Sequence, residues 1–129
     1  LLTGTHNFTN SSGNVFKMAL YTSSATLSAA TTAYTSSNEV SSTNYTAKGG
    51  TLTNVTPSNG SGTVAFASFS TLTFSTVTFT ARGALIHNTS ASDKAVCVLD
   101  FGADKTATAG NFTITFPTND ASTAVIRIV

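Results

Sequence analysis

The chain has 129 residues, of which 40% are hydrophobic and only 9% are charged, and its formal net charge is +1. A chain of this length forms one domain and buries roughly two-thirds of its unfolded surface, so we expect a single domain over residues 1–129. Ordinary soluble domains carry about 25% charged residues, so polarity here must come from hydroxyl and amide side chains. The six lysines and arginines are scattered singly, which argues against a nucleic-acid partner.

Cysteine usage and hydropathy limit the cellular setting. Cys97 is the one cysteine, so an internal disulfide is excluded, and we expect synthesis in a cytosol because small secreted β domains usually carry disulfides. No apolar run approaches the roughly 20 residues of a membrane-spanning helix, and no basic segment followed by an apolar run marks a secretory signal. We therefore expect no membrane partner. Cys97 lies between two valines, away from His or basic residues, which predicts a small buried hydrophobe.

Hydroxyl side chains make up a third of the chain, with 26 Thr and 17 Ser, and they alternate with large apolar residues. Such alternation is typical of β-strands with one solvated face, where β-branched Thr is at home. The sequence indicates short strands separated by Gly-, Asn- and Ser-rich turns, and it has no long segment with a helical period. This pattern predicts an all-β, single-domain antiparallel β-sandwich or jelly roll. In chain order the predicted strands are residues 15–21, 51–55, 63–69, 71–74, 77–82, 84–87, 95–101, 112–116 and 125–129.

Two details refine the predicted strands. The parity of apolar positions changes between Phe74 and Val77, so we expect a turn or a bulge at residues 75–76. Residues 95–101 are apolar on both faces, which predicts a central strand or one covered by a neighbouring chain. The predicted core consists of Phe16, Ala19, Leu20, Phe66, Phe79, Leu85, Leu99, Phe101, Phe112, Ile114 and Phe116, and we expect Phe101→Ala or Ile114→Ala to cost about 2–5 kcal/mol if those side chains are buried.

Residues 22–48 form the one long segment without strong periodicity. Its small residues favour a short helical turn, and residues 36–39 (SSNE) have the spacing of a capping box; otherwise the segment is a loop that a partner orders. We see no self-hydrogen-bonding element in it, and Tyr34, Val40 and Tyr45 are anchors that disordered linkers lack. These three residues are therefore predicted to contact a partner. Tyr34→Ala or Tyr45→Ala should weaken that contact and leave the domain folded.

The sequence predicts no catalytic residues, so we expect that the chain is not an enzyme. Catalysis by a serine needs a base, and His6 and His87 are the only imidazoles. No Gly-x-Ser-x-Gly elbow is present, and His87 lies where a predicted strand enters a loop. We predict no cofactor.

A calcium site is the one metal site that the acidic residues suggest. Asp100 and Asp104, with Asp93 nearby, supply carboxylate oxygens, but calcium loops bring three or more such ligands close together in sequence. We therefore predict no metal, and interpret these residues as solvated turn carboxylates beside Lys94 and Lys105.

Several stretches, in the same order along most of the chain, resemble small virion proteins of tailed bacteriophages. No single motif among them has a known chemical role, so no catalytic residue comes with the resemblance. They are residues 16–22 (FKMALYT), 32–35 (TAYT), 38–40 (NEV), 45–50 (YTAKGG), 81–86 (ARGALI), 98–102 (VLDFG) and 124–128 (AVIRI).

The resemblance implies a structural virion protein encoded near head genes, most of all a capsid decoration (cement) protein. Its partners would be the major capsid protein and further copies of itself, since cement proteins commonly form homotrimers. Its place would be the outer surface of the virion capsid, after synthesis in the cytoplasm of a bacterial host. A tail, fibre or baseplate component that touches host glycan is the alternative, although the chain has no Trp and its three Tyr all lie within the first 45 residues.

Overall fold

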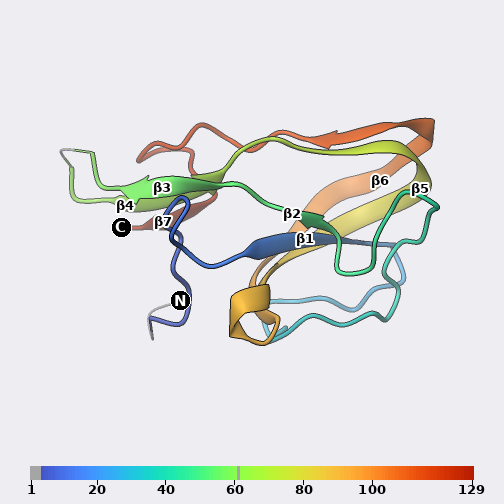
Figure 1. Ribbon diagram of the computed structural model, residues 1–129, viewed down its shortest axis with the longest axis horizontal. Helices are drawn as coiled ribbons and strands as arrows, with labels where there is room; N and C mark the ends of the chain where they lie inside the picture. Colours follow the sequence, from blue (N-terminus) through green and yellow to red (C-terminus); the bar gives the residue numbers. More distant parts are fainter. Residues whose placement is uncertain (1–3, 61) are drawn as a thin grey trace.

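The computed structural model describes residues 4–60 and 62–129 and shows two antiparallel sheets that pack against each other. The four-stranded sheet has the order β2-β1-β5-β6 and consists of β1 (Phe16–Tyr21), β2 (Gly50–Thr51), β5 (Leu72–Asn88) and β6 (Lys94–Ile114) (Figure 1). The three-stranded sheet has the order β3-β4-β7 and consists of β3 (Asn54–Ser58), β4 (Ala65–Phe69) and β7 (Ile126–Ile128). Between β5 and β6 lies a single 3-10 turn, η1 (Thr89–Ala91). The predicted all-β sandwich is confirmed.

Two long strands replace five of the predicted short ones. β5 spans 17 residues and β6 spans 21, and the pair bends together at one end of the molecule, so that it runs through both layers (Figure 1). Bulges, rather than turns, produce the bends. Thr76 has φ 53° where the register shifts between Phe74 and Val77, so of the turn or bulge predicted there the structure has the bulge. Residues 109–111 (AGN) have the composition of a turn, but Ala109 (φ 46°) lies in a second bulge, inside β6.

The other predicted strands match more simply. Residues 15–21, 63–69 and 125–129 contain β1, β4 and β7, whereas residues 51–55 are divided between β2 and β3. β1 is central in its sheet, and its alternate side chains therefore enter two different cores. Phe16, Met18 and Leu20 face the main core between the sheets, while Ala19 and Tyr21 face a second, smaller cluster on the outer face.

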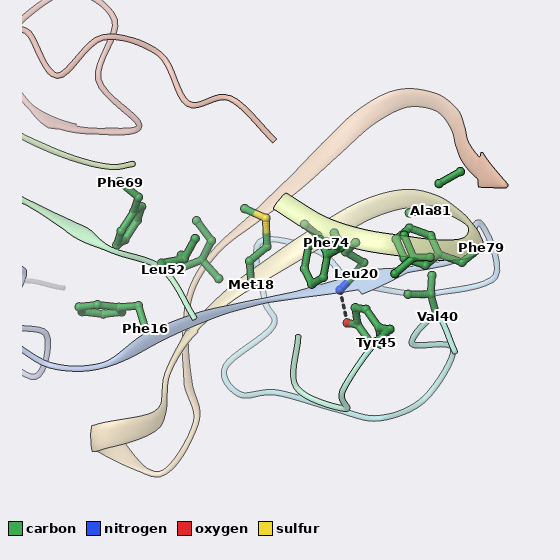
Figure 2. Packing of buried hydrophobic residues seen from close by; sticks show 14 of the residues in the cluster. Phe16, Met18, Leu20, Val40, Tyr45, Leu52, Phe69, Phe74, Phe79 and Ala81 are labelled. Carbon is green, nitrogen blue, oxygen red and sulfur yellow. Dashed lines mark hydrogen bonds between the residues drawn. The ribbon is translucent and has the colours of Figure 1, made fainter. Parts of the chain in front are cut away.

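The main core is rich in aromatic residues, and Figure 2 shows part of it. Phe8 and Phe16 stack with ring centroids 4.6 Å apart, and Phe74 and Phe79 meet edge to face at 6.4 Å. Of the predicted core residues, Phe16, Ala19, Leu20, Phe66, Phe79 and Leu85 are buried as expected. Prediction missed several buried residues whose surroundings are set by loops, among them Phe8, Val40, Tyr45 and Leu52.

Five predicted core residues are only half-buried. They lie on β6, which is at the edge of its sheet, or just after it, and so one side of each remains open to solvent. The expected cost of 2–5 kcal/mol for Phe101→Ala or Ile114→Ala assumed full burial, so both substitutions should cost less than that range. These half-buried residues are Leu99, Phe101, Phe112, Ile114 and Phe116.

Candidate functional site

Residues 22–48 pack on their own domain. Residues 22–35 cover the outer face of the four-stranded sheet, where Ala25, Leu27 and Tyr34 lie against the second cluster. This explains how residues 95–101 can be apolar on both faces although β6 is an edge strand: one face contacts the main core and the other lies under this segment. No second chain is needed to cover it.

Backbone hydrogen bonds hold the segment in place, so the interpretation that it lacks such bonds is wrong. β2 pairs only with Lys17 and Met18 of β1, so the outward backbone groups of Leu20 have no strand partner there. The Val40 N–H donates to the Leu20 carbonyl at 2.9 Å, and the Leu20 N–H donates to the Tyr45 hydroxyl at 2.9 Å (Figure 2). This segment therefore completes the sheet where β2 ends, because buried backbone groups must find partners.

Two of the three predicted anchors are inaccessible for this reason. Val40 is 5% exposed and Tyr45 is 8% exposed, and Tyr45 packs against Phe74 and Phe79 in the main core. Tyr34 is half-buried on the outer face. Because truncating a buried aromatic residue costs about 3–5 kcal/mol, Tyr45→Ala should destabilise the domain rather than leave it folded. Contact of residues 22–48 with a partner stays a prediction, and only Tyr34 remains available for it.

The Glu39 carboxylate is the centre of a hydrogen-bonded cluster. It accepts from the Tyr34 hydroxyl at 2.6 Å, the Tyr45 hydroxyl at 2.8 Å and the Lys48 backbone N–H at 2.8 Å. The helical turn expected at residues 36–39 is absent, because this carboxylate is engaged by two tyrosines and is not used as a cap. The Glu39 N–H closes a turn onto the Ser36 carbonyl at 3.3 Å instead.

All three tyrosines remain hydrogen-bond donors across the ordinary pH range. Burial, followed by the hydrogen bond to Glu39, raises the pKa of Tyr34 to about 12. Burial likewise raises the pKa of Tyr45 and that of Tyr21, whose hydroxyl donates to the Thr35 carbonyl at 2.6 Å. Tyr21 and Tyr45 therefore act as fixed cross-links between the segment and β1, whereas the Tyr34 hydroxyl ties two parts of the segment together.

A second polar cluster lies beside Tyr34. The Lys48 ammonium is 2.5 Å from Asp93 Oδ2, and His87 places Nδ1 3.2 Å from Asp93 Oδ1 and Nε2 3.0 Å from the Lys48 carbonyl oxygen. The hydrogen bond from Lys48 holds the pKa of the Asp93 carboxyl below its usual range. The His87 ring is fully buried and lies 5.1 Å from the Tyr34 ring. The cluster connects the turn before β2, the end of β5 and the turn before β6.

A His–Asp pair is also part of many hydrolytic sites, but this one lacks the geometry of a general base. Both ring nitrogens of His87 face acceptors from the protein itself, and within the described residues no hydroxyl or thiol side chain bonds to the ring. The other imidazole, His6, accepts from the Asn88 amide at 3.0 Å, and burial lowers its pKa. The absence of enzymatic activity stays a prediction, to which this geometry lends support.

The acidic residues considered as calcium ligands are divided between two places. Asp93 belongs to the cluster with His87, whereas Asp100 and Asp104 lie near Arg82, at 3.3 Å and 3.9 Å. Among residues 4–60 and 62–129, no group of three His, Cys, Asp or Glu side chains is placed to hold a metal ion. The described part of the chain also contains no helix long and apolar enough to cross a membrane.

Cys97 is half-buried on β6, and burial raises the pKa of its thiol to about 11. The thiolate is the reactive form of cysteine, so this side chain is chemically quiet at neutral pH. It packs against the main core as a small hydrophobe, but it is half-buried where burial was predicted.

The exposed surfaces of β5 and β6 differ in character. On one face Thr73 pairs with Thr113 and Thr80 with Thr106, with hydroxyl oxygens 3.0 Å and 2.8 Å apart. The other face carries the half-buried apolar residues at the open side of the sandwich. At this open side Phe101, Lys105, Phe112 and Ile114 line a shallow hollow of about 360 Å³, which also reaches Thr113 of the threonine face, and we call this surface the β6 flank.

Comparisons of this chain with protein-family models, with curated proteins and with solved structures found no match.

Proposed function

We propose that this protein is a structural virion protein of a tailed bacteriophage, and specifically a capsid decoration (cement) protein. It would bind the major capsid protein on the outer surface of the assembled head, as a homotrimer, after synthesis in the cytoplasm of the bacterial host. The proposal starts from the resemblance of the sequence to small phage virion proteins, which covers most of the chain.

The observation that best supports a purely structural role is how the polar side chains are used. The clusters around Glu39 and His87 bond inward and fix loops to the sheets, and none of their hydrogen-bonding groups is arranged to activate a substrate. The remaining surface is poor in charge and rich in threonine hydroxyls, with a half-exposed apolar flank. A surface of this kind suits a subunit that is largely covered in an assembly.

A cement protein acts by mass action. If it binds the assembled shell and not the free capsid subunits, then its binding free energy stabilises the shell, by the same linkage that makes a ligand stabilise a folded protein. A rigid sandwich loses little conformational freedom on binding, so more of its contact energy is retained.

Particles that lack this protein should assemble but lose their genome at lower temperature or under milder osmotic shock. Adding the purified protein to such particles should restore their stability. Unchanged stability together with lost adsorption to the host would contradict the proposal and favour the alternative, a tail, fibre or baseplate component that binds host glycan.

A further inference from the structure

We propose that His87, Asp93 and Lys48 form a proton-operated lock, which is closed while the buried His87 ring carries two ring protons and opens when the ring loses one of them. We call these three residues the His87 lock. The closed lock holds residues 22–35 against the outer face of the four-stranded sheet, and a rise in pH loosens that contact. The lock is a property of the domain itself and stands whether or not the protein decorates a capsid.

The geometry of the His87 ring requires two donors. Nε2 lies 3.0 Å from the Lys48 carbonyl oxygen, and Nδ1 lies 3.2 Å from Asp93 Oδ1. A neutral imidazole has one N–H and satisfies only one of these acceptors, whereas the doubly protonated ring donates to both. Because the ring is fully buried, solvent does not compete for either nitrogen. The closed arrangement is therefore that of an imidazolium.

The Asp93 carboxyl is ionised, so it does not supply the second proton itself. Its other oxygen, Oδ2, accepts from the Lys48 ammonium at 2.5 Å, and this hydrogen bond holds the pKa of the Asp93 carboxyl below its usual range. In a ring with one proton, a nitrogen lone pair would face either this carboxylate or the Lys48 carbonyl. A buried contact between two acceptors is unfavourable, so loss of the proton breaks one side of the lock.

The surroundings of the ring oppose and favour the second proton at the same time. Lys17 of β1 lies directly opposite His87, and the residue opposite on β6, Ala95, carries no charge. The Tyr34 ring packs 5.1 Å from the His87 ring, with its hydroxyl bonded to Glu39. Burial and the nearby lysines disfavour an imidazolium, while the carboxylate and the carbonyl within the lock favour it. This balance makes the protonated ring sensitive to pH.

Closing the lock holds two turns in a strained backbone conformation. Lys48 has φ 74° and Asp93 has φ 57°, in the left-handed region that residues with a Cβ adopt only at a cost. The Tyr34 N–H donates to the Asp93 carbonyl at 2.9 Å, and the Ala95 N–H donates to the Thr32 carbonyl at 2.9 Å. These two bonds join the covering segment to the start of β6. When the lock opens, the turns relax and both bonds weaken.

Nuclear magnetic resonance of the wild-type protein reads the lock directly. The nitrogen shifts of the ring, observed through its carbon-bound protons, distinguish one ring proton from two. The His87 ring should carry two protons at pH 7, where an exposed imidazole, with its ordinary pKa of about 6.5, is mostly neutral. In Asp93→Asn an amide N–H₂ can face Nδ1, so a ring with one proton suffices and should be observed. One proton in the wild-type ring at pH 7, or two in both proteins, would overturn the proposal.

Hydrogen exchange tests whether the ring proton controls the covering segment. Between pH 6 and pH 9, the protection of the Tyr34 and Ala95 N–H groups, corrected for the intrinsic effect of pH on exchange, should fall by about tenfold or more, because one proton is lost from the closed lock. The Val40 N–H, which bonds to the Leu20 carbonyl away from the lock, should keep its protection.

His6 provides the matched control for histidine titration in general. Its Nδ1 accepts from the Asn88 amide at 3.0 Å and burial lowers its pKa, so its neutral form is the one that suits the fold. In His6→Gln the fall in protection at Tyr34 should persist, whereas in Asp93→Asn the protection should no longer depend on pH. An equal fall at Val40 and Tyr34, or a fall that persists in Asp93→Asn, would overturn the proposal.

Discussion

Removing one hydroxyl group, in Tyr45→Phe, should destabilise the domain strongly. The hydroxyl donates to Glu39 at 2.8 Å and accepts from the buried Leu20 N–H at 2.9 Å, so the substitution leaves a backbone donor without a partner and weakens the bonding of a carboxylate. Each buried unsatisfied group costs about 1–3 kcal/mol and a hydrogen bond to a charged group contributes about 1.5–3 kcal/mol. Because Glu39 keeps its bonds from Tyr34 and Lys48, the second contribution is only partly lost, and we expect a loss of about 2–4 kcal/mol in unfolding free energy.

For a chain of 129 residues the entropy of unfolding is about 0.27 kcal/mol per degree, so this loss lowers the thermal midpoint by about 7–15 °C. Tyr21→Phe is the matched control, because it deletes a single hydrogen bond to the Thr35 carbonyl and should cost about 1 kcal/mol. Urea unfolding followed by circular dichroism measures both. If Tyr45→Phe costs less than about 0.5 kcal/mol, or no more than Tyr21→Phe, then Tyr45 does not complete the sheet as described.

Three further predictions concern the turns, the acidic pH range and the thiol. Gly49→Ala should cost more than about 3 kcal/mol in urea unfolding, because Gly49 has φ 76° and the new Cβ would overlap a carbonyl oxygen of β1. Gly102→Ala is the control: Gly102 has a similar φ of 75° but open space around it, so the substitution should cost about 1–2 kcal/mol. Equal costs for the two variants would contradict the close approach at Gly49. The folded-state pKa of Asp93 is lowered, so the ionised carboxylate stabilises the fold above its unfolded pKa of about 4, and this stabilisation is lost as the pH falls further. Asp93→Asn should therefore flatten the dependence of unfolding free energy on pH in that range. An unchanged slope would contradict this role of Asp93. Cys97 should react slowly with a thiol reagent at pH 8 in the native protein and rapidly in urea, and rapid native labelling would show that the thiol is accessible and ionised.

The sequence was sufficient to predict the all-β class and the place of one irregularity, because both follow from alternation of apolar side chains. A change of parity between Phe74 and Val77 can only be absorbed by an extra residue, and the bulge at Thr76 is where it had to be. The continuity of β5 and β6 was not predictable in the same way. Residues 109–111 have the composition of a turn, and only the pairing with β5 shows that the strand continues through them.

The way in which residues 22–48 pack on the sheet could not be predicted from the local sequence pattern. Tyr45 and Val40 are buried because β2 is too short to cover β1, and the length of β2 depends on pairing between segments far apart in sequence. The three bonds to Glu39 likewise join residues of one loop only after that loop has folded over the sheet. An acidic residue with tyrosines five residues before and six residues after it was the one available signal.

The central claim is that this protein decorates the phage head, and an electron-microscopy map of the intact particle tests it most directly. The account predicts density for the β-sandwich on the outer surface of the capsid, at symmetry-related positions and on the order of hundreds of copies per particle, with neighbouring copies in contact. Density for the sandwich at the tail in only a few copies, or its absence from the particle, would contradict the claim.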